Sequence, residues 1–219
     1  MLKMKLQTMS TAHIHKIKPR VAKRMLDFVF GSMLTLILLP IITLLILFSY
    51  LFQGSPVFFS QTRVGLGGRN FKLFKFRTMV NNAESLGSKV TVGGDMRITP
   101  WGNILRRCKF DELPQLWNVI RGDMSLVGPR PEVPEYVKLY DEQQQRVLTV
   151  RPGITDVASL KYYNESEQLA KVDDPKRFYI EQIMPDKIRM NLEYIDNAST
   201  LQDLVVISKT ALRVLKIFS

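Results

Sequence analysis

The longest hydrophobic segment of this chain covers residues 25–52, and Asp27, near its start, is the only charged residue in it. A helix needs about 20 apolar residues to cross a bilayer, and this segment is longer than that. A secretory signal peptide fits less well, because its apolar region usually has about 7–15 residues. No A-x-A-like cleavage site follows the segment either. We therefore predict a membrane helix over residues 20–55.

Pro40 lies near the middle of this hydrophobic segment. Proline removes a backbone donor and clashes with the preceding turn, so we expect a bend or a break there. Lysine and arginine are abundant on both sides of the segment, and such flanks favour the cytoplasmic side of a membrane. A re-entrant helix, broken at Pro40, satisfies both flanks by returning to the side it entered from. The alternative is an ordinary spanning helix that tolerates its proline.

After the membrane segment the hydrophobic pattern changes to short runs. Residues 57–63 and 71–77 are rich in β-branched and aromatic side chains, and glycines separate them. This pattern predicts a β-hairpin. The glycines do not match the dinucleotide-binding pattern G-x-G-x-x-G, and the chain contains no P-loop motif. The hairpin is therefore not expected to bind a nucleotide in either of those ways.

Most of the remaining chain shows helical patterns. Helices are predicted for residues 98–108, 113–121 and 135–150 and for the segments beyond Asn164. Gly122 is expected to end the second of these helices, and Pro175 and Pro185 to interrupt the last segments. Pro129, Pro131 and Pro134 predict a stiff extended segment between the second and third helices. Two pairs have the spacing of N-cap boxes, Asn164 with Glu167 and Ser199 with Gln202.

The last predicted helix, residues 201–218, is amphipathic and basic. Its apolar side includes Leu204, Val205, Leu212 and Leu215, and its other side carries Lys209, Arg213 and Lys216. Such a helix can lie among lipid head groups. It can equally be a surface helix packed on the core, and the pattern leaves both interpretations open.

The composition indicates an anionic partner. Lys and Arg number 31 against 20 for Asp and Glu, a net charge of +11. This balance fits nucleic acid, phospholipid head groups or a phosphorylated substrate. The single cysteine, Cys108, excludes an intramolecular disulfide and a Cys-rich zinc site. The only histidines, His13 and His15, lie in a polar leader, so the sequence argues against catalysis centred on histidine.

The densest group of reactive side chains surrounds Asp111 and Glu112, which follow Arg106, Arg107 and Lys109. One interpretation is structural, with Asp111 as an N-cap and Glu112 as a first-turn residue. The other is catalytic, because an ionised aspartate can attack phosphorus and form an acyl-phosphate. Two carboxylates beside two substrate phosphates would repel one another, so such a site needs a divalent cation. Mg²⁺ fits, since it prefers carboxylate and phosphate oxygens.

Three further cations are candidates for binding phosphate. Arg130 lies between Pro129 and Pro131, which fix its backbone and could aim its guanidinium at a phosphate. Lys75 and Arg77 lie in the second predicted strand. For these two, a solvated strand face or a contact with lipid head groups is the commoner explanation.

Several motifs together resemble the signature of the bacterial sugar transferases, the monotopic phosphoglycosyl transferases. They are DELPQLWNV at residues 111–119, GDMSLVGPRP at 122–131, KFRTM at 75–79 and RPGIT at 151–155. The resemblance extends from about Lys23 almost to the end of the chain. It is closest to the minimal catalytic-core type, without the additional N-terminal membrane helices of larger relatives. Two positions depart from the family pattern: Leu39 stands where small members often have Ser, and Asp156 follows Thr155 where many have Gly.

The resemblance implies a fold and an activity. The expected fold is α/β and mostly helical, with a small β-hairpin, a re-entrant helix broken at Pro40 and interfacial amphipathic helices. Residues 1–19 would form a basic leader, 20–55 the membrane helix and 56–219 a cytoplasmic catalytic domain. The implied reaction transfers a phosphosugar from a UDP-sugar to a polyprenyl phosphate such as undecaprenyl phosphate, with UMP released, at the bacterial inner membrane. This would be the first membrane step of a surface-glycan pathway.

The resemblance also implies roles for individual residues. Asp111 would be the nucleophile and a Mg²⁺ ligand, and Glu112 would complete the catalytic dyad. Arg106 and Arg130 would bind phosphate or nucleotide, with Lys75 and Arg77 as further candidates. The rival hypothesis is a membrane-tethered basic protein that binds nucleic acid or anionic lipid without catalysis. The sequence contains no recognisable nucleic-acid-binding module, and it leaves the sugar and the oligomeric state open.

Overall fold

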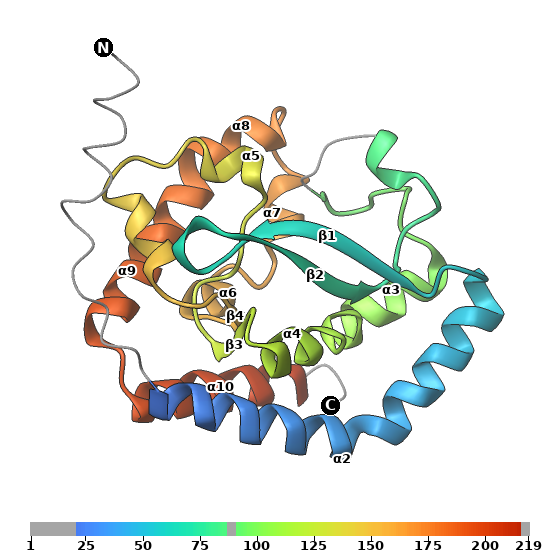
Figure 1. Cartoon of the computed structure of the whole chain (residues 1–219). Coiled ribbons are helices and arrows are strands. Elements are labelled where there is room, and N and C mark those ends of the chain that lie inside the picture. Colours follow the sequence, from blue (N-terminus) through green and yellow to red (C-terminus); the bar gives the residue numbers. More distant parts are fainter. Residues whose placement is uncertain (1–20, 87–90, 216–219) are drawn as a thin grey trace, which may run out of the picture.

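The computed structural model describes residues 21–86 and 91–215, and most of them are helical (Figure 1). Two small two-stranded sheets lie among the helices. The expectation of a mostly helical fold with a small hairpin is therefore confirmed. The predicted leader with His13 and His15, and the predicted end of the last helix, lie outside the described residues.

Helix α2, Val21–Gln53, accounts for the predicted membrane segment. It is long and apolar enough to cross a membrane by length and composition. Pro40 lies inside it, and Figure 1 shows that the ribbon bends partway along but stays continuous. The expected bend is therefore observed, whereas a complete break of the helix is not. The helix can continue past Pro40 because proline removes only one backbone donor, and the other helical hydrogen bonds can still form.

One side of α2 packs on the rest of the protein. Gly31 lies against helix α4, Gln115–Arg121, so closely that a Cβ at Gly31 would lie 3.1 Å from Cγ1 of Val119. Further along, Leu45 joins a buried cluster with Phe76 and Leu105. Near the end of the helix, the indole Nε1 of Trp101 donates to Ser49 Oγ at 2.9 Å. The helix is therefore docked near its beginning and again near its end.

The single acidic residue of the apolar segment is part of this docking. Asp27 is buried, and its Oδ1 accepts hydrogen bonds from Ser125 Oγ at 3.0 Å and from the backbone N–H of Leu126 at 3.1 Å. Arg24 donates to the carbonyl oxygens of Val119 and Ile120 at 2.6 and 2.7 Å. The charged residues at the start of α2 therefore attach it to the domain, a role that the hydrophobic pattern alone did not indicate.

The other sides of α2 expose large apolar side chains. In the most apolar 18-residue stretch of α2, only 11% is buried. The exposed residues include Phe28, Phe30, Leu36, Ile37, Leu44, Leu47, Leu51 and Phe52. A continuous apolar surface of this kind is not stable in water and marks a membrane or protein contact.

The predicted hairpin is confirmed. Strands β1, Phe58–Val64, and β2, Asn70–Phe76, pair antiparallel, and a short 3₁₀ turn, Leu66–Gly68, connects them. The buried side chain of Asn118, from α4, extends the pairing. Its Oδ1 accepts from the N–H of Phe74 at 3.1 Å, and its Nδ2 donates to the carbonyl of Lys72 at 2.7 Å.

Helix α3, Pro100–Arg107, and helix α4 lie close to their predicted positions. Thr99 caps α3 by accepting from the N–H of Gly102. Gly122 ends α4 with a φ of 90°, the left-handed conformation that glycine adopts at little cost. Another short 3₁₀ turn, Ala83–Ser85, precedes α3.

The second sheet was not predicted. Strands β3, Ser125–Val127, and β4, Gly153–Thr155, are three residues long each and pair in parallel. Their backbones approach so closely that a Cβ on Gly153 would lie 2.1 Å from the nitrogen of Gly128. Two glycines are therefore required where this sheet forms.

The predicted helix over residues 135–150 is wrong. The chain forms a short helix α5, Pro134–Val137, and a separate 3₁₀ segment, Gln144–Thr149. Asp141 and Gln144 exchange side chain to backbone hydrogen bonds at 2.8 and 3.1 Å. This local turn competes with a continuous helix.

The last third of the chain is helical as expected. Its helices are α6 Val157–Lys161, α7 Glu165–Leu169, α8 Pro175–Phe178, a π-helical turn Tyr179–Ile183, α9 Met184–Asn197 and α10 Thr200–Leu215. Pro175 begins α8 as expected. The predicted interruption at Pro185 is wrong, because the helical run continues through it: Pro185 lies in the first turn of α9, where π geometry changes to α.

The two predicted N-cap boxes have different outcomes. Ser199 Oγ accepts from the N–H of Gln202 at 3.2 Å, which confirms its capping role. The prediction for Asn164 is wrong, because its side chain makes no capping hydrogen bond and its backbone is not extended.

Helix α10 lies beside the first part of α2 (Figure 1), and Lys23 Nζ forms an ion pair with Asp203 Oδ2 at 2.6 Å. It packs on the domain through buried Val206 and through Thr210, whose Oγ1 lies 2.7 Å from Thr155 Oγ1. The predicted apolar side is exposed at Leu204, Val205 and Leu212. The helix is thus docked by one side and presents its apolar residues on another.

Candidate active site

Asp111 and Glu112 lie in a 3₁₀ turn, Phe110–Glu112, that connects α3 to α4. Lys109 precedes the turn in the left-handed conformation, with a φ of 59°. Non-glycine residues adopt this conformation rarely, and it is often found at functional sites. Phe110 and Leu113 pack against the buried cluster that contains Leu45 of α2. The turn is therefore held against α2 by its apolar residues.

Asp111 is not an N-cap, so the structural interpretation of this residue is wrong. Its side chain is only 7% exposed, and Oδ1 has no hydrogen-bond partner among the described residues. Burial raises the pKa of Asp111, with the negative charge of Glu112 acting in the same direction. Lys75, Lys109 and Arg106 favour the ionised form and oppose the rise in pKa. The result is a desolvated carboxylate surrounded by cations.

Glu112 has the opposite environment. Its Oε1 accepts from Lys75 Nζ at 2.9 Å, and the guanidinium of Arg130 donates to both of its oxygens, to Oε2 at 3.3 Å. Burial alone would raise the pKa of Glu112, but Arg130 and Lys75 outweigh it and hold this pKa well below its usual value. Glu112 therefore stays ionised and is occupied by its two partners.

Arg130 is positioned by a residue that the sequence analysis did not assign to the site. Its backbone N–H donates to Asp156 Oδ2 at 3.1 Å, and Asp156 also accepts from Asn191 Nδ2 at 3.1 Å and from the N–H of Ser159 at 2.6 Å. Asp156 is buried. The guanidinium of Arg130 lies beside Glu112, and the negative charge of Glu112 raises the pKa of Arg130 above its usual value. The spacing of Asp156 and Ser159, an N-cap pattern, was the signal in the sequence for part of this role.

The other predicted cations fall into two groups. Burial lowers the pKa of Lys75, and the charge of Glu112 opposes this decrease. Burial likewise lowers the pKa of Arg106, and the charge of Asp111 opposes it. Arg106 Nε also donates to Thr78 Oγ1 at 2.8 Å. The structure thus brings Lys75 and Arg106 together with the two carboxylates.

Arg77 has a different location. Its guanidinium is buried and donates to the carbonyl oxygens of Gln53 and Gly54, the latter at 3.0 Å, and to Asn81 Oδ1. A solvated strand face is therefore the wrong explanation for Arg77. Its charge lies at the C-terminal end of α2, where a cation stabilises the last carbonyl groups.

The donor set around Asp111 is compatible with Mg²⁺. The described residues contain no group of three or more His, Cys, Asp or Glu side chains that could enclose a metal. Mg²⁺ commonly binds one or two protein carboxylates and takes its remaining ligands from water and substrate phosphates. The carboxylate of Asp111 could supply such a ligand, whereas Glu112 is already bound by Lys75 and Arg130.

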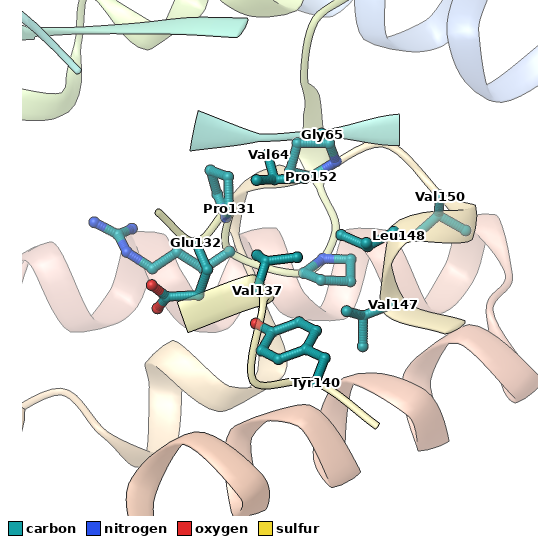
Figure 2. A pocket seen from close by; sticks show the side chains of 12 residues that line it. Val64, Gly65, Pro131, Glu132, Val137, Tyr140, Val147, Leu148, Val150 and Pro152 are labelled. Carbon is teal, nitrogen blue, oxygen red and sulfur yellow. The ribbon is translucent and has the colours of Figure 1, made fainter. Parts of the chain in front are cut away.

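A shallow pocket is lined in part by residues 129–132, the segment that carries Arg130 (Figure 2). Its lining is mostly apolar and includes Tyr140, Val147 and Leu148, together with the carboxylate of Glu132. The lining includes Arg130 but neither Asp111 nor Glu112. The pocket is therefore adjacent to the candidate site but separate from its two carboxylates.

Comparison with known proteins identifies the class. Residues 18–217 match the family model described as bacterial sugar transferase. The match covers nearly the whole chain and includes α2, the hairpin and the turn with Asp111 and Glu112. The chain therefore belongs to the bacterial sugar transferase family.

Curated relatives agree with this assignment. The chain is 40% identical over 162 residues to the uncharacterized sugar transferase EpsL of Bacillus subtilis (strain 168), covering 74% of this chain and 71% of the relative. It is 35% identical over 207 residues to the UDP-glucose:undecaprenyl-phosphate glucose-1-phosphate transferase of Caulobacter vibrioides, covering 88% and 70%. It is also 39% identical over 158 residues to the UDP-N-acetylgalactosamine-undecaprenyl-phosphate N-acetylgalactosaminephosphotransferase of Aeromonas hydrophila, covering 71% of this chain and 34% of that relative.

Proposed function

We propose that this chain is a polyprenyl-phosphate phosphoglycosyl transferase. It would move a phosphosugar from a UDP-sugar to undecaprenyl phosphate and release UMP, an early membrane step of a bacterial glycan pathway. The printed activities of the Caulobacter and Aeromonas relatives support this donor and acceptor. The observation that carries the proposal is the buried, unpartnered Oδ1 of Asp111 beside a Glu112 that two cations neutralise.

In the first step, Asp111 Oδ1 attacks the β-phosphorus of the UDP-sugar. A bond forms between Oδ1 and this phosphorus, and the bond from the phosphorus to the bridging oxygen breaks, so UMP leaves with that oxygen. The product is a phosphosugar linked to Asp111. Arg106 and Lys75 supply positive charge beside the reacting carboxylate and stabilise the negative charge that develops on the phosphates in the transition state.

Asp111 is also the residue that would hold Mg²⁺. The metal would neutralise charge on the diphosphate when bound. Because Asp111 is only slightly exposed, few water molecules surround its carboxylate. A poorly hydrated carboxylate is a stronger nucleophile than a fully solvated one.

In the second step, an oxygen of undecaprenyl phosphate attacks the phosphorus of the intermediate. The bond to Asp111 Oδ1 breaks, and the carboxylate is restored. The acceptor phosphate is already anionic, so the step needs no general base. We assign Glu112 a positioning role, because its oxygens hold Lys75 and Arg130 in fixed places beside Asp111.

The location of α2 fits a reaction between a soluble donor and a lipid acceptor. We propose that α2 enters the cytoplasmic leaflet of the inner membrane and returns through the bend at Pro40, with its exposed apolar side chains in lipid. α10 would lie at the interface with its exposed apolar residues inward. This arrangement keeps the carboxylates at the membrane surface, where both substrates can reach them.

The topology has a direct test. Single cysteines near positions 5 and 62, in a Cys108→Ser background, should both be labelled by a membrane-impermeant reagent from the cytoplasmic side only. Labelling of the two positions from opposite sides would establish a spanning helix instead.

The reaction is tested with the full chain in detergent. Mg²⁺-dependent release of UMP from a panel of UDP-sugars should require undecaprenyl phosphate for multiple turnovers. Without acceptor, the intact mass should increase by one phosphosugar, located on the peptide that contains Asp111. An Asp111→Asn chain with no added mass supports the covalent route, and substantial turnover by that variant contradicts it. No UMP release across the panel would favour the non-catalytic hypothesis.

A further inference from the structure

Two cationic side chains flank one aromatic ring near the candidate site. Lys109 Nζ lies 5.5 Å from the centre of the Tyr163 ring, and Arg213 Cζ lies 4.5 Å from it. The three residues come from distant parts of the chain: the turn before Asp111, the segment between α6 and α7, and the end of α10. The fold therefore assembles this group, which we call the Tyr163 cluster.

The charges of the Tyr163 cluster are unbalanced. Lys109 and Arg213 are exposed, and neither forms an ion pair with a carboxylate among the residues that the structure describes. Their distances to the ring place the two charges within roughly 10 Å of each other, close to the screening length in physiological salt. The aromatic face attracts each cation, but the cations repel one another. A bound anion would remove this repulsion and satisfy both donors.

The location of the cluster indicates which anion. Lys109 is two residues before Asp111, and its charge acts on both Asp111 and Glu112. Arg213 belongs to α10, which exposes Leu212 beside it and is joined to α2 by the Lys23–Asp203 ion pair. In Figure 1 the end of α10 approaches the connection between α3 and α4. The cluster thus connects the end of α10, with its exposed Leu212, to the turn that carries the two carboxylates.

We propose that Lys109, Tyr163 and Arg213 form the subsite for the phosphate group of the lipid acceptor, a polyprenyl phosphate. This inference rests on the proposed function. The cluster binds the anionic head group while the polyprenyl chain stays against the apolar surface, and it delivers a phosphate oxygen toward the phosphosugar on Asp111. The soluble donor does not need this contact. Anionic phospholipid offers the same phosphate chemistry, and the experiment must separate the two sources.

Arg213→Gln is the main variant, and Lys209→Gln is its control, because Lys209 is an exposed cation one turn earlier on the same helix. With the full chain in detergent, Arg213→Gln should raise the KM for undecaprenyl phosphate about tenfold, while the KM for the UDP-sugar changes less than twofold. Lys209→Gln should change neither. Arg213→Lys should restore part of the acceptor affinity. Equal changes in both KM values, or none for Arg213→Gln, would overturn the proposal.

The aromatic ring provides a second test. Tyr163→Phe keeps the ring and should retain the acceptor KM, whereas Tyr163→Leu removes it and should raise this KM severalfold. If both variants behave like wild type, the ring does not organise the subsite.

Binding without turnover separates the two lipid sources. Native mass spectrometry of the full chain should show retention of undecaprenyl phosphate that Arg213→Gln reduces, with retention of phosphatidylglycerol unchanged. Loss of phosphatidylglycerol alone would assign the cluster to general lipid contact and refute the acceptor subsite. Arg213-dependent binding of undecaprenyl phosphate by a chain that releases no UMP would refute the proposed function and leave the subsite intact.

Discussion

The two carboxylates of the candidate site, Asp111 and Glu112, lie on sides of it that differ in burial and in hydrogen bonding. On one side Asp111 is buried, its Oδ1 is unpartnered, and burial raises its pKa. On the other side Glu112 is largely but less completely enclosed, and Lys75 and Arg130 bind both of its oxygens and lower its pKa. Neighbouring acidic residues of one turn therefore have opposite electrostatic environments. This difference supports the proposed roles, with Asp111 as the nucleophile and Glu112 as the residue that positions Lys75 and Arg130.

This contrast also has an energetic side. A buried carboxylate without a hydrogen-bond partner lowers the stability of the fold, and such residues are retained where function needs them. A buried carboxylate bound by two cations stabilises the arrangement of those cations, and its removal leaves them unpaired. Substitutions on the two sides should therefore have opposite effects on stability, although both reduce activity.

Asp111→Asn should have the largest effect on activity. We expect the rate of UMP release to fall by about 10³-fold or more, because the amide cannot form the acyl-phosphate. The melting temperature should increase, since the variant no longer buries an ionised carboxylate. Activity assays and thermal unfolding of the same preparation check both. Asp173→Asn, an exposed aspartate of the same charge, should change neither quantity. A large loss of stability in Asp111→Asn would refute this description of the Asp111 side.

Glu112→Gln should reduce both quantities. The variant leaves Lys75 and Arg130 without their carboxylate, and we expect a loss of about 2 kcal/mol in the free energy of unfolding. Activity should fall about 100-fold, because the two cations lose their fixed positions. Chemical denaturation and UMP release measure these effects. Glu165→Gln, which breaks the partly exposed pair with Lys187, should cost less than about 1 kcal/mol. Equal losses in the two variants would contradict the special role of Glu112.

Asp156→Asn should have a smaller effect, transmitted through Arg130. The amide can no longer accept from both the N–H of Arg130 and Nδ2 of Asn191 while also capping Ser159. We expect a loss of about 1 kcal/mol in stability and about a tenfold decrease in activity. Asp174→Ala is the matched control, because it removes the side-chain cap of α8 far along the chain from Arg130. It should lower stability without lowering activity.

Local patterns were sufficient to predict much of this fold. The strands β1 and β2, the helices α3 and α4, and the stop at Gly122 follow from alternation, helical periodicity and a glycine in the left-handed conformation. The helix over residues 135–150 failed because the Asp141–Gln144 turn competes with it. Strands β3 and β4 are too short to show a pattern, and their pairing depends on contacts far apart in the sequence.

The sequence predicted which residues belong to the site but not how they pair with one another. The order of charges around Asp111 marked the turn, and the resemblance assigned the roles. Which carboxylate is neutralised could not be predicted, because Lys75 and Arg130 are 37 and 18 residues from Glu112 in the chain. The location of Arg77 at the end of α2 and that of Asp156 beside Arg130 also depend on tertiary contacts.

The smallest predicted effect is a difference in how pH changes stability on the two sides, measured without Mg²⁺ in the presence of a chelator. The folded-state pKa of Asp111 is raised above its usual 3.8, so ionised Asp111 destabilises the fold at neutral pH. This penalty disappears as the pH falls through the folded-state pKa and the carboxyl takes up a proton. The higher melting temperature expected for Asp111→Asn should therefore approach that of wild type as the pH is lowered from about 8 toward the usual carboxyl pKa of 3.8.

Glu112 should behave differently at every pH above its usual pKa of 4.5. Its folded-state pKa lies well below the usual 4.5, so its contribution to stability is fully present above 4.5 and is lost only at lower pH. The difference in melting temperature between wild type and Glu112→Gln should consequently stay constant from about pH 8 to about pH 5. If this difference also shrank, Glu112 would be taking up a proton in that range, which contradicts its ion pairs with Lys75 and Arg130. A constant difference for Asp111→Asn would mean that its carboxyl is not destabilised by burial.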